Sequence, residues 1–151
     1  MTDAWLGLGA NLGDRRATLL RALDLLGEHG EVLERSAFIE TEPVGAEGPD
    51  YLNAVCRLAT ELAPRELLDA TQAIEAALGR DPAAKGTGAP RPIDIDLLLY
   101  GDRRVDEPGL VIPHPRLHER AFVLEPLASL APGLVHPVLG VTVGALAEGI
   151  G

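Results

Sequence analysis

Cysteine, basic residues and long apolar runs are all scarce in this sequence of 151 residues. The one cysteine, Cys56, excludes an internal disulfide and a cysteine-based zinc site. The formal charge of −10 argues against general nucleic-acid binding, because phosphate backbones need a basic face. No apolar run approaches the roughly 18 residues of a membrane-spanning helix, and the first residues lack the basic start and apolar core of a signal peptide. We therefore expect a cytoplasmic protein that contacts neither nucleic acid nor membrane.

Three common site motifs are also missing or incomplete. No G-x-x-x-x-G-K-[ST] segment is present, so there is no P-loop lysine. The segment Gly7-Leu-Gly-Ala-Asn-Leu-Gly13 resembles the dinucleotide fingerprint, but its third glycine comes one residue late and no repeated β-α-β units follow. His114 and His118 have the spacing of zinc ligands, yet Pro115 places His114 before a helix rather than within it, and further ligands are lacking. A P-loop enzyme, a Rossmann dehydrogenase and a zinc enzyme are all disfavoured.

What is present indicates an α/β (α+β) fold in a single domain over residues 1–151. Asp14 fits an N-cap, Pro64 suits the first turn of a helix, and Gly27 and Gly79 follow the ends of two apolar helical repeats. The pattern predicts these elements in order: a strand at 5–9, a helix after 14, strands at 32–41 and 51–60, a helix after 64, a strand through 94–97, a short helix around 117–130 and another in the tail. The β-α-β-β-α-β order is ferredoxin-like, an antiparallel sheet with helices packed on one face.

Two aspartates interrupt the last of these strands, in Arg91-Pro-Ile-Asp94-Ile-Asp96-Leu. On a strand both carboxylates point to the same face, roughly 6.5 to 7 Å apart. Two like charges at the edge of a core are costly unless a cation lies between them or each has its own partner. Oxygen ligands without nitrogen or sulfur favour magnesium, which binds one or two carboxylates together with substrate phosphates. The alternative is that one aspartate pairs with Arg91 while the other caps a loop.

Basic residues gather in the same part of the chain. Seven of the 13 fall between positions 80 and 120: Arg80, Lys85, Arg91, Arg103, Arg104, Arg116 and Arg120. Guanidinium groups beside carboxylates suit a small polyphosphate bound with metal. The alternative is a solvated surface, which we expect for Arg103 and Arg104. His114 is interpreted as a hydrogen-bond donor to phosphate, with a loop-capping histidine as the alternative.

Four blocks of this sequence, taken together, resemble one known family. They are Gly9-Ala-Asn-Leu-Gly13, Pro49-Asp-Tyr-Leu-Asn53, Pro90-Arg-Pro-Ile-Asp-Ile-Asp-Leu97 and Ile112-Pro-His-Pro-Arg-Leu-His-Glu-Arg-Ala-Phe-Val-Leu124. The family is hydroxymethyldihydropterin pyrophosphokinase of folate biosynthesis, and the match runs in order from about Leu6 to Pro137. It implies a ferredoxin-like fold and an enzyme that transfers pyrophosphate from ATP to the hydroxymethyl group of 6-hydroxymethyl-7,8-dihydropterin, releasing AMP, with two Mg²⁺ ions. A competing hypothesis is a non-catalytic sensor of magnesium and nucleotide on the same scaffold.

The resemblance implies an ATP site between the second helix and the aspartate-bearing strand. Asp94 and Asp96 match the magnesium ligands, and Arg80 and Arg91 match arginines that contact phosphates; these four are the implied catalytic residues. The other matches to the ATP site are His114 and Arg120, as further phosphate contacts, and Leu68, Gln72, Glu75, Leu97, Val111 and Ile112. Catalysis should then rest on positioning and electrostatics, because the nucleophile is the substrate's own hydroxyl.

For the pterin, the resemblance implies two stacking rings and one amide. Tyr51 and Phe122 match residues that lie on opposite faces of the pterin. Without the resemblance, core packing would be the preferred explanation for these two residues, and a turn for Asn53. Asn53 matches the side chain that reads the pterin edge, joined by backbone groups from Thr41 through Pro43 to Val44.

The sequence departs from better-known members of the family at the loop 80–92, which we expect to act as a lid. It has Lys85 near the place where some relatives carry a tryptophan, so a looser lid is expected. Gly109 stands where some members have an arginine. We also expect a monomer.

Overall fold

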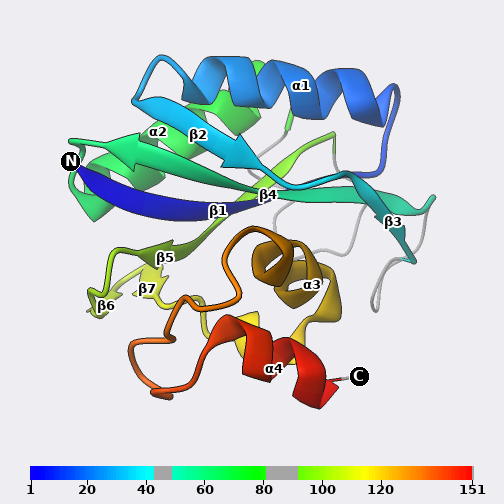
Figure 1. Cartoon of the computed structure of the whole chain (residues 1–151). Coiled ribbons are helices and arrows are strands. Elements are labelled where there is room, and N and C mark those ends of the chain that lie inside the picture. Colours follow the sequence, from blue (N-terminus) through cyan, green and yellow to red (C-terminus); the bar gives the residue numbers. More distant parts are fainter. Residues whose placement is uncertain (43–48, 81–91, 151) are drawn as a thin grey trace.

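A central antiparallel sheet organises the fold (Figure 1). The structure is a computed structural model that describes residues 1–42, 49–80 and 92–150. Within those ranges the strand order is β2-β4-β1-β5, and β3 pairs with β4. The strands are β1 (Thr2–Ala10), β2 (Glu31–Arg35), β3 (Ile39–Thr41), β4 (Tyr51–Thr60) and β5 (Asp94–Tyr100). This order is that of the ferredoxin-like pattern, so the predicted fold class is confirmed.

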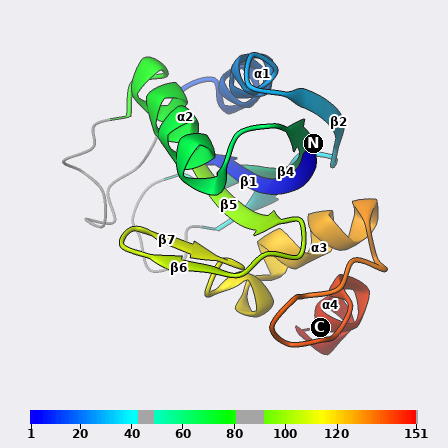
Figure 2. The ribbon, with the colours of Figure 1, turned by 90° about the vertical axis from the view of Figure 1, so that its left-hand side faces the viewer.

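Helices cover both faces of the sheet (Figures 1 and 2). On one face, α1 (Arg15–Leu26) and α2 (Pro64–Ala77) bury a core that includes Leu6 and Leu58. On the other, α3 (Ala121–Leu130) and α4 (Val143–Ile150) bury a second core around Trp5, Val55 and Leu98. The prediction of helices on one face therefore holds only for α1 and α2. The central strands are apolar on both faces, and each apolar face needs a cover.

Local signals placed the starts of α1 and α2 correctly. The Asp14 side chain accepts a hydrogen bond from the Ala17 amide (3.1 Å) and caps α1. At α2, Pro64 occupies the first turn and the Glu66 carboxylate accepts the Ala63 N–H (2.9 Å). The helix predicted from 117 begins as a short 3-10 helix (Leu117–Glu119), and α3 starts only at Ala121. None of the helices in the described ranges is both long and apolar enough to cross a membrane.

The predicted strand 32–41 is two strands, because Ser36 interrupts the pairing. Its hydroxyl accepts the Val55 N–H (2.9 Å), while its own N–H donates to the Val55 carbonyl (2.8 Å). A side-chain acceptor thus replaces part of the ladder between β2 and β3. The break leaves β3 free to pair with the other end of β4, where Thr41 lies opposite Tyr51.

A short hairpin of β6 (Val105–Glu107) and β7 (Leu110–Ile112) lies where the sequence pattern predicted no strand. Its turn contains Pro108 and Gly109, and Gly109 has a φ of 75°. A proline followed by a glycine with positive φ is typical of a type II turn, so the Pro-Gly pair in the sequence indicates the turn of this hairpin. The hairpin sets β7 beside β5 and closes one side of the site described next (Figure 2).

Candidate active site

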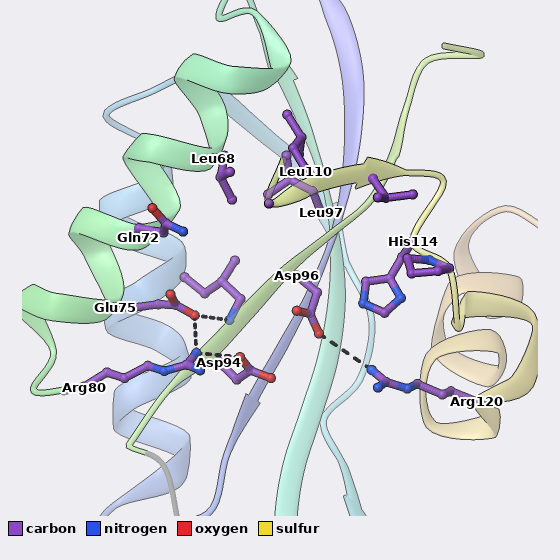
Figure 3. Close-up of a pocket in the computed structure, with 14 residues that line it drawn as sticks. Leu68, Gln72, Glu75, Arg80, Asp94, Asp96, Leu97, Leu110, His114 and Arg120 are labelled. Atoms are coloured by element: carbon purple, nitrogen blue, oxygen red, sulfur yellow. Dashed lines mark hydrogen bonds and ion pairs between the residues drawn. The ribbon is translucent and has the colours of Figure 1, made fainter. Parts of the chain in front are cut away.

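A cavity of about 450 Å³ lies between α2, β5, β7 and the segment that leads into α3 (Figure 3). It brings together most of the residues predicted to form the ATP site. Those that line it are Leu68, Gln72, Glu75, Arg80, Asp94, Asp96, Leu97, Val111, His114 and Arg120. The side chain of Ile112 is instead buried in the core, with 1% of its surface exposed. Arg91 and Lys85 lie outside the described residues, as does nearly all of the predicted lid.

One carboxylate oxygen of Glu75 organises the α2 side of the cavity. Its Oε2 accepts hydrogen bonds from Nη1 of Arg80 (2.6 Å) and from the backbone N–H of Ile95 (2.8 Å). The same Arg80 nitrogen also donates to Oδ1 of Asp94 (2.6 Å), and the Arg80 side chain is only 8% exposed. Glu75 therefore joins α2 both to the guanidinium group and to the start of β5 (Figure 3).

The second aspartate has a weaker partner. Oδ2 of Asp96 lies 3.9 Å from Nη1 of Arg120, across the cavity from the Arg80 cluster (Figure 3). Burial, followed by the charge of Asp94, raises the pKa of Asp96 to about 7. Burial also raises the pKa of Glu75. Removal from water is thus the largest cause of both shifts, and the neighbouring arginines only partly offset it.

The loop-capping expectation for His114 fits its position, and its role toward phosphate stays a prediction. Its Nδ1 accepts the backbone N–H of Arg116 (3.1 Å), so the imidazole caps the loop, and it also lines the cavity. Burial and the nearby Arg120 lower the pKa of His114 to about 4. The ring is therefore neutral at pH 7 with its proton on Nε2, which makes it a donor without charge.

Arg103 and Arg104 lie outside the cavity, and both are exposed, as expected for solvated side chains. Arg103 lies over the Tyr100 ring (5.7 Å to the centroid). Arg104 donates to the carbonyl of Pro137 (2.8 Å) and so ties the β5–β6 connection to the C-terminal loop.

The residues predicted to bind the pterin come from β3, β4 and α3. Nδ2 of Asn53 donates to the hydroxyl of Thr41 (2.6 Å), and Asn53 is 7% exposed. Phe122 is partly buried against the second core, with the Arg120 guanidinium 5.5 Å from its ring centroid. Tyr51 begins β4 and is also partly buried. Pro43 and Val44 lie outside the described residues.

The sheet register connects the two groups. Gly9 on β1 is the pairing partner of Asn53 on one side and of Asp94 on the other. Residues directly opposite in antiparallel strands point to the same face, so Asn53 and Asp94 share a face with Gly9 between them. The Gly7-x-Gly9 pattern within an apolar strand is a sequence signal for close approach of neighbouring groups, although its spacing also resembles an incomplete dinucleotide motif.

Comparison with known proteins identifies the family. The model of the 7,8-dihydro-6-hydroxymethylpterin-pyrophosphokinase (HPPK) family matches residues 5–132. The chain belongs to the HPPK family. The predicted resemblance is confirmed, and with it the reaction class, ATP-dependent pyrophosphoryl transfer in folate biosynthesis. The alternative of a non-catalytic sensor is not favoured.

Full-length relatives agree with this assignment to HPPK. A Porphyromonas gingivalis protein named 2-amino-4-hydroxy-6-hydroxymethyldihydropteridine pyrophosphokinase is 47% identical over 141 residues, which cover 91% of this chain and 95% of that protein. A Bacillus subtilis protein of the same name is 42% identical over 130 residues, covering 84% and 77%. Among solved structures, wild-type Plasmodium falciparum HPPK-DHPS with SDX-DHP has a TM-score of 0.79 at 16% identity. That match covers 98% of this chain but only 44% of the other, so it bears on the fold of the HPPK part alone.

Proposed function

We propose that the cavity holds ATP with two magnesium ions, and that β3, β4 and α3 hold the pterin beside it. Asp94 and Asp96 are the proposed metal ligands, and the ATP phosphates lie toward Arg80, Arg120 and His114. The observation that carries this proposal is the placement of both aspartates on one cavity wall, between two arginines (Figure 3).

The donor set fits magnesium. Among the residues that the structure describes, no three His, Cys, Asp or Glu side chains could hold a metal ion as a group. Magnesium suits such a site because it binds through one or two carboxylates and completes its coordination with water and substrate phosphates. Burial and the charge of Asp94 raise the pKa of Asp96, and a cation at this position would favour its ionised form. A bound divalent cation supplies neutralisation of the triphosphate charge.

The charges of the cavity explain why a cation is needed. Glu75, Asp94 and Asp96 oppose Arg80 and Arg120, and His114 is neutral, so these described side chains carry one net negative charge when ionised. A polyanion would be repelled by that balance. The arginines can still contact individual phosphate oxygens, and His114 can donate through Nε2 without adding charge.

The reaction follows from this arrangement. The substrate hydroxyl oxygen forms a bond to the β-phosphorus of ATP, the bond from the β-phosphorus to the oxygen bridging it to the α-phosphorus breaks, and AMP leaves while the hydroxyl proton is released. Arg80 and Arg120 position the phosphates, and Leu68 and Leu97 offer apolar surface to adenine. This is catalysis by alignment and charge stabilisation, without a covalent enzyme intermediate.

The pterin site has the chemistry of a flat, polar heterocycle. Tyr51 and Phe122 would stack on the ring, which gains about 0.5 to 1.5 kcal/mol beyond area burial. The hydrogen bond from Asn53 Nδ2 to Thr41 turns the amide so that Oδ1 can accept an N–H of the pterin edge.

The test measures AMP release from ATP, magnesium and the reduced hydroxymethylpterin. Wild-type protein should release AMP in proportion to pterin diphosphate, and Asp94→Ala and Asp96→Ala should each lose that activity while remaining folded. A folded wild-type protein that binds ATP and magnesium yet releases no AMP would favour the sensor instead. The single domain over residues 1–151, the monomeric state, the cytoplasmic location and the absence of nucleic-acid or membrane contacts stay predictions.

A further inference from the structure

Gly9 has no side chain at a position where the backbone does not require a glycine. It lies in β1, between β4 and β5, and it is not among the glycines with positive φ. A glycine within a strand weakens that strand, because its backbone loses more entropy on folding and it has no side chain to pack. The reason for a glycine here must therefore lie in what surrounds it.

Two side chains approach the place that a side chain of residue 9 would take. A Cβ atom built on Gly9 would lie 3.0 Å from Oδ1 of Asn53 and 3.4 Å from Cδ1 of Tyr51. The first of these distances is tighter than nine in ten real Cβ contacts, so with any larger residue the Asn53 amide would have to shift by a few tenths of an ångström. Asn53 has little freedom to move, because it is buried and its Nδ2 is bonded to Thr41.

On its other side, Gly9 neighbours Asp94, one of the two proposed metal ligands. Asn53, Gly9 and Asp94 stand side by side across three strands on one face of the sheet. Since neighbouring strands are about 4.7 to 4.9 Å apart, Asn53 and Asp94 are separated by about 9 to 10 Å at the backbone, with Gly9 midway. The space above Gly9 therefore separates the Asn53 amide, the proposed pterin contact, from the Asp94 carboxylate, a proposed metal ligand.

We propose that Gly9 is a positioning residue that sets the specificity of the pterin site. Because Gly9 has no side chain, the Asn53 amide can lie against β1. The space above Gly9 also stays open, so the short hydroxymethyl group of the pterin can reach the ATP phosphates. This inference rests on the proposed function, because it takes Asn53 and Tyr51 as pterin contacts. The ligand class it selects is a flat heterocycle with a short primary alcohol.

Gly7 provides a matched control on the same strand and the same face. The three atoms nearest to a Cβ built there all belong to the Leu98 side chain, the nearest at 3.5 Å, which is ordinary van der Waals contact. Gly7 pairs with Asp96 across the strands, so the control also tests whether a methyl group on this face by itself disturbs metal and ATP binding. Gly7→Ala and Gly9→Ala therefore make the same chemical change two residues apart, and only Gly9→Ala crowds Asn53.

The experiment measures two dissociation constants by calorimetry for each variant, together with thermal unfolding. One is for a non-hydrolysable ATP analogue with magnesium, and the other is for the reduced hydroxymethylpterin in its presence. Gly9→Ala should weaken pterin binding about tenfold or more, the effect of losing one hydrogen bond to the ligand, while ATP-analogue binding stays within about twofold of wild type. Gly7→Ala should leave both constants within about twofold. Pterin affinity unchanged by Gly9→Ala, or an equal loss of both affinities, would overturn the inference.

A double-mutant cycle with Asn53→Ser separates crowding from a general loss of structure. In the Asn53→Ser background, which removes the crowded amide, Gly9→Ala should cost less than about twofold in pterin affinity, so the two effects should be strongly non-additive. If Gly9→Ala fails to fold by itself, the double variant should fold; additive effects, or unfolding in both backgrounds, would refute the proposal. A wild-type protein that binds no pterin would instead refute the proposed function, so the two failures are distinguishable.

Discussion

The hydrogen bonds of Glu75 predict that this cavity residue supports the fold even without substrate. Glu75 belongs to α2, and its Oε2 is the acceptor both for Arg80 (2.6 Å) and for the Ile95 N–H (2.8 Å). In Glu75→Ala the Ile95 N–H loses its acceptor, which costs about 1 to 3 kcal/mol when the donor is buried. Arg80 keeps its bond to Asp94, so we add no separate penalty for the guanidinium.

The expected shift in melting temperature follows from the size of the protein. For a domain of this length, 1 kcal/mol corresponds to about 2 to 4 °C, so Glu75→Ala should lower Tm by about 2 to 12 °C in the absence of ligands. Because a single oxygen accepts both bonds, the amide oxygen of Glu75→Gln can replace it, and this variant should lose about 1 kcal/mol or less. Thermal unfolding followed by circular dichroism measures both.

Gln72→Ala is the control, since Gln72 is exposed and lines the same cavity one turn earlier on α2. Its Tm should stay within about 1 °C of wild type, as for most surface substitutions. The reasoning is refuted if Glu75→Ala melts with wild type, or if Glu75→Gln loses as much stability as Glu75→Ala.

Three further predictions concern metal binding, pterin stacking and pH. Asp96→Asn should abolish AMP release yet keep or raise Tm at pH 8. Burial and Asp94 raise the pKa of Asp96 to about 7, so at pH 8 the folded protein holds an unfavourable charge that an amide avoids. A clearly lower Tm would contradict this. Phe122→Leu should weaken pterin binding about 2- to 12-fold through lost stacking and leave ATP-analogue binding unchanged, and equal losses for both ligands would count against a stacking role. His136 is buried, and its Nδ1 accepts the N–H groups of Val138 (3.2 Å) and Leu139 (3.1 Å). Burial lowers the pKa of His136 in the folded protein, so the unfolded chain binds a proton more readily. The free energy of unfolding should therefore fall as the pH drops below about 6.5. His136→Asn should show a smaller fall in urea-unfolding free energy between pH 7 and 5, because its side-chain oxygen can accept the same bonds without titrating; an identical fall would show that other groups cause it.

Much of the candidate site could be predicted from the sequence because its signals are local. The spacing of Asp94 and Asp96 on a strand placed both carboxylates on one face, and both do line the cavity. The alternative interpretation of the aspartates pairs one of them with Arg91, which lies outside the described residues. Among the described residues, the structure pairs Asp94 with Arg80. Arg80 follows α2, and its approach to β5 depends on how α2 packs on the sheet.

The sequence by itself determined the helix starts at Asp14 and Pro64, the fold class and the family, because capping, periodicity and short motifs depend on residues close together in the chain. Only the tertiary structure decided that Glu75 joins Arg80 to β5, that Ser36 splits a strand, and that Gly9 stands between Asn53 and Asp94. Those relations depend on register and packing between segments more than 18 residues apart. A shift of one residue in the β1–β4 register would turn Asn53 to the opposite face of the sheet, although no local signal in either strand would change.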